Sequence, residues 1–327
     1  QEYLAYLVDD DCSAVALEAS SHGLAQGRLN GTQINVAVFT NMTRDHLDYH
    51  ADFDSYHESK QQLFSWEGLK TAVVNLDDEF GRRLCSSIGD GVEVLAVSAS
   101  SSEADIYGKD IRLHDDGLSF SVCSPWGEAK VRSPLVGRFN VHNLLSTLGV
   151  ICSQSYGFEE AISVISEIGM VKGRMEVIRN PGQPTVIIDY AHTPDALDKA
   201  LQATKEHCLG ELWCVFGCGG DRDKGKRPLM GEIASTHASH VVITDDNPRS
   251  ESSLVIANEI AHGVVAGVDV EIEADRRTAI WKTLSNAGSR DVVLIAGKGH
   301  EEYQEVSGKK LAFSDHDVVG DYVSSSQ

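Results

Sequence analysis

The sequence has no long apolar run, and this excludes a membrane-spanning helix from the printed chain. No stretch approaches the roughly 20 apolar residues that cross a bilayer. The first residues, Gln1, Glu2 and Tyr3, also lack the basic and apolar regions of a signal peptide. We therefore expect a soluble, cytoplasmic protein that does not bind membranes.

Positive charge is scarce, because 28 Lys and Arg face 49 Asp and Glu, a net charge of −21. This balance argues against binding to the phosphate backbone of nucleic acid. Any phosphorylated ligand must then be held by local loops. The 7 cysteines are scattered through apolar segments such as 213–215, which indicates reduced thiols rather than disulfides. Cys214 and Cys218 have no second pair with which to bind zinc.

Two phosphate-binding motifs are missing. No Gly-Lys-Ser/Thr occurs, so the printed chain contains no P-loop. No Gly-x-Gly-x-x-Gly follows a first strand, which argues against a nicotinamide-dependent oxidoreductase. The chain also opens inside a predicted helix without an initiator Met. We interpret it as a fragment of a longer protein.

What is present predicts an α/β protein of two domains, 1–172 and 173–327. In the first domain we expect buried parallel strands at 13–17, 35–39 and 71–75, with a helix at 53–66. Antiparallel strands over 105–132 and a second helix at 140–154 should follow. In the second we expect a doubly wound, Rossmann-like sheet with strands at 185–189, 212–216, 240–244, 268–271 and 291–296. Its helices are predicted at 194–204, 227–236, 252–263 and 276–285.

Polar loops follow the predicted strands of the first domain. Glu18 ends the first strand, where a carboxylate could hold Mg²⁺ beside nucleotide phosphates, although Ser20 in the same loop could simply cap a helix. His46, in the next loop, is either a metal neighbour or a surface histidine. Lys60 lies on an apolar helix face, where it could extend to solvent or be modified. Asn140 and Asn143 share the first turn of the last helix, and capping explains only one of them.

Charged, glycine-rich loops also follow the strands of the second domain. They are 189–194, 217–227, 246–249 and 297–301. The cations of 217–227 suit a carboxylate as well as a phosphate, and Arg249 could bind a carboxylate with both arms of its guanidinium. Turns alone would not explain such loops after at least three strands of one sheet.

Six motifs, in order, resemble those of the Mur ligases, and among them the members that add meso-diaminopimelate. They are Glu18-Ala-Ser-Ser-His-Gly23, Thr43-Arg-Asp-His-Leu-Asp-Tyr-His50, Gly137-Arg-Phe-Asn-Val-His-Asn143, Asp189-Tyr-Ala-His-Thr-Pro194, Gly217-Cys-Gly-Gly-Asp-Arg222 and Gly297-Lys-Gly-His-Glu301. Asp246-Asn-Pro-Arg249 looks like the signature that selects diaminopimelate. The resemblance covers nearly the whole chain and implies a central ATPase-like domain, here without its P-loop, followed by the Rossmann-like domain.

The resemblance also implies a role for each matching residue. Mg²⁺ would be held by Glu18, His46 and Lys60, the lysine as a carbamate that also serves catalysis. A UDP-N-acetylmuramoyl dipeptide would contact Ser20, Gln26 and Arg28. ATP would contact Asn140, Asn143, Arg174, Asp189 and His192. Meso-diaminopimelate would contact Arg222, Asp246, Asn247, Pro248, Arg249, Gly297 and Glu301, with its carboxylates on the two arginines and an ammonium group on Glu301.

The implied reaction is an ATP-dependent amide ligation through an acyl phosphate, as in peptidoglycan synthesis. We expect a monomer that acts on small molecules. Because the P-loop is missing, the printed chain by itself is expected to be inactive. Two alternatives remain. One is a lysine-adding or folyl-polyglutamate relative, and Asp246-Asn-Pro-Arg249 argues against it. The other is a non-catalytic binding module, and the missing P-loop favours it.

Overall fold

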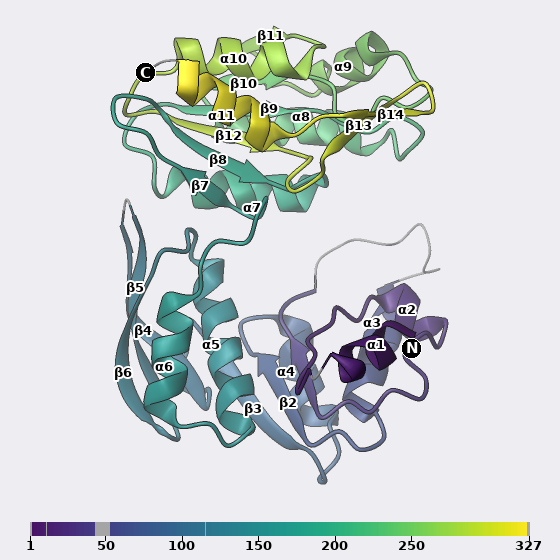
Figure 1. Ribbon diagram of the computed structural model, residues 1–327, viewed down its shortest axis with the longest axis vertical. Coiled ribbons are helices and arrows are strands. Elements are labelled where there is room, and N and C mark those ends of the chain that lie inside the picture. Colours follow the sequence, from purple (N-terminus) through teal and green to yellow (C-terminus); the bar gives the residue numbers. More distant parts are fainter. Residues whose placement is uncertain (1, 11, 43–52, 115, 326–327) are drawn as a thin grey trace. The chain divides into compact units, whose positions relative to one another are not determined.

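Two six-stranded sheets, each with its own helices, organise the chain (Figure 1). The computed structural model describes residues 2–10, 12–42, 53–114 and 116–325. One compact unit comprises residues 1–110, 120–131 and 141–165. The other comprises residues 111–119, 132–140 and 166–327. We describe each sheet with its own helices.

The first sheet has the strand order β1-β2-β3-β4-β5-β6, and β1 to β4 are parallel. Its strands are β1 (Val36–Phe39), β2 (Thr71–Asn75), β3 (Glu93–Ser98), β4 (Ile106–His114), β5 (Gly117–Ser124) and β6 (Gly127–Ser133). The connections β4–β5 and β5–β6 are too short for a parallel crossover, so these strands form hairpins, as the alternation over 105–132 predicted. All five residues of β2 are buried, as in the middle of a covered sheet.

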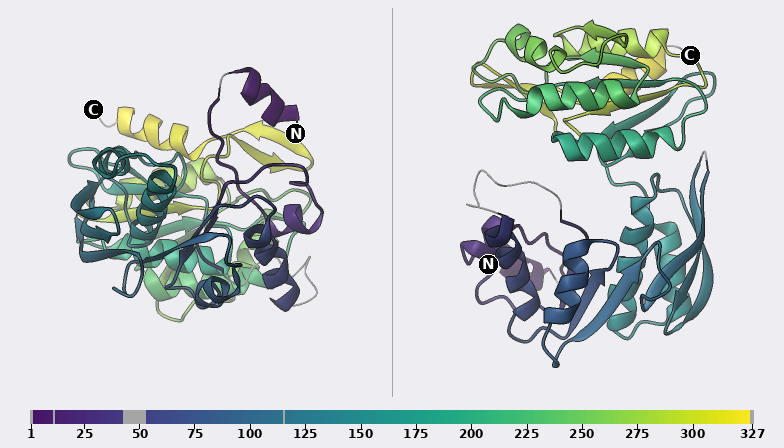
Figure 2. Two further views of the ribbon diagram at one scale, coloured as in Figure 1. Left: turned by 90° about the horizontal axis from the view of Figure 1, so that it is seen from below. Right: turned by 180° about the vertical axis from the view of Figure 1, so that it is seen from behind.

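The helices of this part begin and end where local chemistry allows. They are α1 (Glu2–Asp9), α2 (Ser21–Ala25), α3 (Phe53–Gln61), α4 (Glu79–Ser87), α5 (Phe139–Ser153) and α6 (Phe158–Glu167). Asp78 caps α4 by accepting from the amides of Phe80 and Gly81. The helix predicted over 53–66 is α-helical only to Gln61 and then tightens to a 3₁₀ turn. Figures 1 and 2 show α5 and α6 on one face of β4–β6.

One predicted strand is wrong. Residues 13–17 form no strand in the structure, and Val15 and Leu17 are 46% and 44% exposed. An apolar run becomes a strand only if a neighbouring backbone bonds it, and no described strand pairs with this segment. The other two predicted parallel strands, 35–39 and 71–75, correspond to β1 and β2.

The second sheet has the order β11-β10-β9-β12-β8-β7, parallel except for β7. Its strands are β7 (Glu176–Ile178), β8 (Thr185–Asp189), β9 (Leu212–Phe216), β10 (His240–Ile243), β11 (Asp269–Ile272) and β12 (Val292–Ala296). The five predicted strands are therefore confirmed within one or two residues. A separate hairpin, β13 (Tyr303–Val306) and β14 (Lys309–Ala312), was not predicted.

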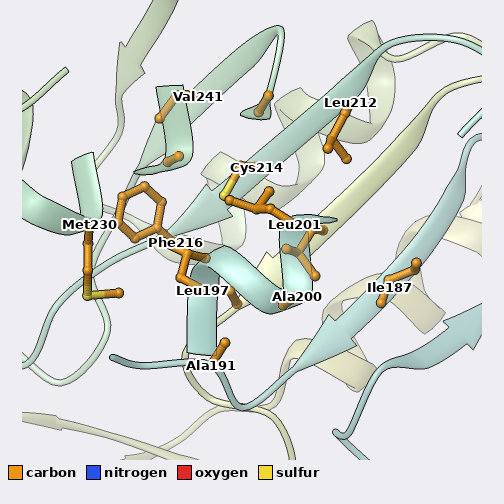
Figure 3. Close-up of a cluster of buried hydrophobic side chains, with 14 of the residues drawn as sticks. Ile187, Ala191, Leu197, Ala200, Leu201, Leu212, Cys214, Phe216, Met230 and Val241 are labelled. Atoms are coloured by element: carbon orange, nitrogen blue, oxygen red, sulfur yellow. The ribbon is translucent and has the colours of Figure 1, made fainter. Parts of the chain in front are cut away.

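Helices cover both faces of this sheet. They are α7 (Pro194–Lys205), α8 (Lys226–His237), α9 (Ser253–Ala261), α10 (Arg276–Asn286) and α11 (Asp315–Ser325). Alternate residues of each strand face opposite cores. Phe216 and Cys214 pack with α7, α8 and α9, as Figure 3 shows for Leu197, Leu201 and Met230. Val215 lies in the other core, which is formed with α10 and α11.

Among the described residues, no helix combines the length and apolar character that crossing a bilayer requires.

Candidate functional site

The carboxyl ends of β8, β9, β10 and β12 lie at one edge of the second sheet, because these strands are parallel neighbours. The loops there are in tight contact. A Cβ atom on Gly217 would overlap the carbonyl oxygen of Thr244, and one on Gly220 would overlap that of Pro248. Glycine is therefore required where the loop after β9 touches the loop after β10.

Asp189 ends β8 and organises the first of these loops. Its carboxylate accepts from the backbone amides of Met175 and Ala191, both at 2.8 Å. Burial raises the pKa of this carboxyl, and the two amide donors oppose the shift. The guanidinium of Arg174 lies 4.7 Å from the ring centre of Tyr190, and His192 packs edge-on against the same ring. Three of the predicted ATP contacts, Arg174, Asp189 and His192, are thus grouped around Tyr190.

The other two predicted ATP contacts lie on α5. The side-chain amide of Asn140 donates to the carbonyl of Val136 at 2.8 Å, which holds the start of the helix. Asn143 is on the next turn, where its carbonyl accepts from Thr147. Asn140 is therefore engaged at the start of the helix as a donor to a carbonyl, and not as the N-cap acceptor that the sequence allowed for one asparagine of the pair.

The guanidinium of Arg249 contacts both the loop after β9 and the strand β13. Its Nη1 donates to the carbonyl of Gly220 at 2.9 Å, and its Nε lies 3.2 Å from Glu305 Oε2 on β13. A Cβ atom on Gly219 would lie 2.8 Å from Arg249 Nη1 and 3.7 Å from Arg222 Cγ. The two predicted carboxylate-binding arginines therefore flank the same glycine. The guanidinium of Arg222 is exposed and donates to the carbonyl of Asp221 at 3.3 Å.

The residues predicted around an ammonium group lie next to this pair. Asp246 and Asn247 are 7% and 5% exposed, and Asn247 Nδ2 donates to Glu301 Oε2 at 3.0 Å. Gly297 has a φ of 114°, and a Cβ atom there would lie 3.4 Å from Asp246 Oδ2. The structure thus brings Asp246, Asn247, Gly297 and Glu301 together.

Sequence reasoning assigned no role to Lys298, although the motif 297–301 contains it. This side chain is fully buried. Its ammonium donates to Asn247 Oδ1 and Glu301 Oε2, both at 3.2 Å, and lies 3.5 Å from Asp246 Oδ1. Lys298 is therefore the common partner of three predicted site residues.

A second missed group holds the loop after β9. Arg227 is fully buried and forms two parallel bonds with Glu251, at 2.9 and 3.0 Å. It also contacts Glu259 and the carbonyl of Gly219. The hydrogen bonds from Arg227 lower the pKa of Glu251 to about 2. Glu251 in turn accepts from the amide of Asp221 at 2.6 Å, which fixes the backbone beside Arg222.

The remaining predicted residues that the structure describes lie in and near α2 and α3. Ser20 caps α2 by accepting from Gly23 N at 3.1 Å, and Arg28 Nε donates to Gln26 Oε1 at 2.9 Å. Burial lowers the pKa of the Lys60 ammonium, and the carboxylate of Glu18 opposes this shift. Glu18 and Lys60 are therefore close enough to interact. His46 lies outside the described residues.

The first unit also has a polar cluster that sequence reasoning missed. Asp77 follows β2, and its carboxylate accepts at 2.6 Å from Ser98, the last residue of β3, and at 2.6 Å from Ser100, which follows that strand. His142 Nε2 on α5 lies 3.2 Å from the same carboxylate. Hydrogen bonds from the serines and an amide, together with the nearby imidazole, outweigh burial and lower the pKa of Asp77. This cluster joins α5, which carries Asn140 and Asn143, to the carboxyl end of the sheet.

The donor chemistry at Glu18 fits Mg²⁺, which prefers oxygen ligands. Lys60 is a cation in its ordinary state, so it would contribute only after conversion to an anionic carbamate. Within the described ranges, no three His, Cys, Asp or Glu side chains are grouped closely enough to hold a metal.

Comparisons with known proteins match both halves of the chain to one family. Residues 1–151 match the Mur ligase middle domain and residues 173–299 match the Mur ligase, glutamate ligase domain. A UDP-N-acetylmuramoyl-L-alanyl-D-glutamate--2,6-diaminopimelate ligase from Chromobacterium violaceum is 47% identical over 321 residues, which are 98% of this chain and 65% of that protein. One from Pseudomonas aeruginosa is 45% identical over 96% of this chain and 64% of its own length.

A solved structure of such a ligase is also similar. It has a TM-score of 0.67 and 41% identity, and the match covers 95% of this chain and 64% of that one. The chain thus spans about 65% of the length of the curated relatives that it matches.

Proposed function

Because the chain belongs to the Mur ligases, we propose that its protein adds meso-diaminopimelate to UDP-N-acetylmuramoyl-L-alanyl-D-glutamate in an ATP-dependent ligation. The observation that carries this proposal is the pair of arginine side chains beside Gly219, the guanidinium of Arg249 and the stem of Arg222, with the carboxylate of Glu301 at the same sheet edge. Two cations and an anion match an amino acid that has two carboxylates and an exposed ammonium group. The names of the relatives agree with this chemistry.

In the amino-acid subsite, Arg222 and Arg249 bind the carboxylates and Glu301 binds the ammonium group. Planar guanidinium groups suit carboxylates because they offer two parallel N–H donors. Arg249 already has its Nε and Nη1 engaged by Glu305 and Gly220, which hold the remainder of the guanidinium in a defined direction. Asp246, Asn247, Pro248 and Gly297 complete the subsite.

ATP is bound by Asn140, Asn143, Arg174, Asp189 and His192. The carboxylate of Asp189 is suited to a ribose hydroxyl, and the Tyr190 ring with Arg174 over it offers a flat surface for a base. The dipeptide substrate contacts Ser20, Gln26 and Arg28. These assignments follow the family motifs and are compatible with the polar contacts described above.

Mg²⁺ is held by Glu18, His46 and Lys60, with Lys60 as a carbamate. When bound, the ion neutralises the negative charge of the phosphates. Burial lowers the pKa of Lys60, which favours the neutral amine that can take up CO₂. Labelling with ¹³C-bicarbonate should give a carbamate NMR signal in the wild type, and persistence of that signal in Lys60→Gln would refute this assignment.

In the reaction, the terminal carboxylate of the glutamate attacks the γ-phosphorus of ATP, and the bond to ADP breaks. The amine of diaminopimelate then attacks the acyl phosphate. Loss of phosphate and a proton leaves the amide. Arg222, Arg249 and Glu301 orient the amine, and this orientation replaces a bimolecular search by a positioned attack.

The remaining partners are small molecules. A net charge of −21 disfavours nucleic acid, and we propose a cytoplasmic monomer with domains at 1–172 and 173–327. A lysine-adding relative would lack a use for the second guanidinium. A non-catalytic module would bind the same ligands without releasing phosphate.

The test is calorimetric titration of the chain with meso-diaminopimelate and with L-lysine. We expect the wild type to bind meso-diaminopimelate at least about tenfold more tightly than L-lysine, because a charge-assisted hydrogen bond to the second carboxylate is worth about 1.5–3 kcal/mol. Arg249→Ala should weaken the binding of meso-diaminopimelate by a similar factor and leave ATP binding unchanged.

The matched control is Arg277→Ala, since Arg277 forms an exposed ion pair with Asp321 on α11. This variant should bind meso-diaminopimelate like the wild type. Equal affinity for L-lysine and meso-diaminopimelate would favour the lysine-adding alternative. An unchanged affinity in Arg249→Ala would contradict the proposed subsite.

A further inference from the structure

Lys298 has an environment that few lysines share. Its side chain is fully buried at the carboxyl end of β12, although lysine is rarely buried without a partner. Its ammonium meets Asn247, Glu301 and Asp246 at 3.2, 3.2 and 3.5 Å, and the ring of Tyr303 lies 5.8 Å away. A buried ammonium is tolerated only when paired and hydrogen-bonded, so these contacts keep it in place.

The contacts occupy one side of the Glu301 carboxylate. Oε2 accepts from both Lys298 and Asn247. Within the part of the chain that the structure describes, no group donates to Oε1, and the side chain is 19% exposed. A carboxylate can accept up to about four hydrogen bonds. Oε1 is therefore left for a donor that comes from outside the protein.

Lys298 also sets the direction of Asn247. The amide oxygen of Asn247 accepts from Lys298 at 3.2 Å and from the backbone amide of Glu305 at 2.8 Å. With its oxygen held by two donors, the amide must present its nitrogen to Glu301. One buried ammonium thus orients both side chains that border the ammonium subsite.

The charges of the side chains around Lys298 also favour an ammonium group as the ligand. Asp246 and Glu301 contribute two negative charges, and Lys298 neutralises one of them. Nearby, Arg249 is paired with Glu305. Among these three side chains, two carboxylates face one ammonium, so a ligand ammonium at Glu301 would complete the pairing.

We infer that Lys298 is a positioning residue for the ammonium subsite, which fixes Glu301 and Asn247 and leaves Glu301 Oε1 to bind an ammonium group of the ligand. This inference rests on the proposed function, in which Glu301 receives an ammonium of meso-diaminopimelate. It goes beyond that function by making selection for the second ammonium depend on a residue that the ligand does not touch.

The experiment compares two ligands by calorimetric titration of the chain. Meso-diaminopimelate carries two ammonium groups and 2-aminopimelate carries one, with the same two carboxylates. The wild type should prefer meso-diaminopimelate by at least about tenfold. Lys298→Met should reduce this preference to less than about threefold, because Glu301 loses its support.

A double-mutant cycle separates this role from a purely structural one. Glu301→Gln should lose the same preference, and Lys298→Met in the Glu301→Gln background should change the affinity by less than about threefold. Additive losses in the double variant would overturn the inference, as would an unchanged preference in Lys298→Met. Leu294→Ala is the matched control, because it removes a fully buried side chain of β12 in the hydrophobic core. It should destabilise the protein and keep the preference.

If Lys298→Met fails to fold, Lys298→Arg takes its place. Arginine keeps the charge but not the compact ammonium. The Lys298→Arg variant should therefore fold and lose part of the preference for meso-diaminopimelate over 2-aminopimelate. A full preference in Lys298→Arg together with no loss in Glu301→Gln would refute the inference. If the wild type binds neither ligand, the proposed function fails; if it binds both and the Lys298 variants keep the preference, only this inference fails.

Discussion

At the scale of single residues, a buried ion pair stabilises the edge of the second sheet. Arg276 on α10 and Asp315 on α11 are both fully buried and form two bonds, at 2.8 and 2.9 Å. The same guanidinium donates to the carbonyls of Asp245 and Ala296, which directly precede Asp246 and Gly297. The ion pair therefore supports two loops of the proposed amino-acid subsite from inside the protein.

Asp315→Asn should reduce the free energy of unfolding by about 3–5 kcal/mol, because it leaves a buried guanidinium without its counter-charge. Chemical denaturation followed by circular dichroism measures the change. Asp321→Asn on the same helix is the control, since its pair with Arg277 is exposed and should be worth less than about 1 kcal/mol. Equal losses in the two variants would contradict the buried pair's importance.

At the scale of elements, a histidine that can change its protonation state connects strands at the opposite edge of the second sheet. His240 begins β10, stacks on Trp213 of β9 with ring centres 3.8 Å apart, and bonds Glu211 and Asp269 at 2.8 and 3.1 Å. Burial would lower the pKa of His240, but hydrogen bonds to the two carboxylates and their charges outweigh it and raise the pKa above 6.5. The protonated imidazole thus joins three neighbouring strands.

This arrangement predicts a pH dependence of stability. A raised pKa in the folded state means that the contribution is complete below about pH 6.5 and is lost as pH rises through the higher folded value. The difference in unfolding midpoint between the wild type and His240→Gln should therefore shrink from about pH 6 to pH 8. A difference that grows with pH in this range would reverse the assignment.

Some elements were predictable and others were not, for identifiable reasons. β8 and β9 have the predicted bounds because short apolar runs end at a polar residue or before a glycine. Residues 13–17 have the same pattern but no partner among the described strands, and a pattern alone does not reveal a partner. The hairpin β13–β14 was missed because charged residues obscure its alternation. Glu305, which pairs with Arg249, arrives on that hairpin.

The same limit applies to the site. Loops after parallel strands predicted that Arg222, Arg249 and Glu301 would share one edge, because topology alone brings these loops together. The role of Lys298 depends on its burial, and burial of a lysine cannot be read from its neighbours in the sequence. Arg227 was missed for the same reason.

At the scale of the whole molecule, both cores of the second sheet are built almost entirely from residues 166–327. Of the described residues that are buried in these cores, only Val136 lies outside that range. A domain with its own cores is expected to fold alone. This separation allows one half of the protein to be studied by itself.

A chain of residues 166–327 should unfold in one cooperative transition and bind meso-diaminopimelate. This chain lacks residues 111–119 and 132–140 of the same unit, and loss of the Val136 contact alone should cost about 1.5 kcal/mol. The control is residues 166–313, which lacks α11 and Asp315 and should not fold cooperatively because Arg276 would be left unpaired. A non-cooperative transition for 166–327 itself would show that its cores depend on the remainder of the chain.

The backbone at Arg249 limits how the specificity of this protein can be redesigned. Arg249 adopts a φ of 50°, and its amide and carbonyl bond Glu305 and Ser307 on both sides. In that left-handed conformation β-branched side chains are strongly disfavoured, whereas Gly, Asn and Asp are tolerated best. A mutational library at this position should therefore yield folded proteins mainly with unbranched or small side chains, and an apolar pocket made from Val or Ile is inaccessible without rebuilding the hairpin that holds it.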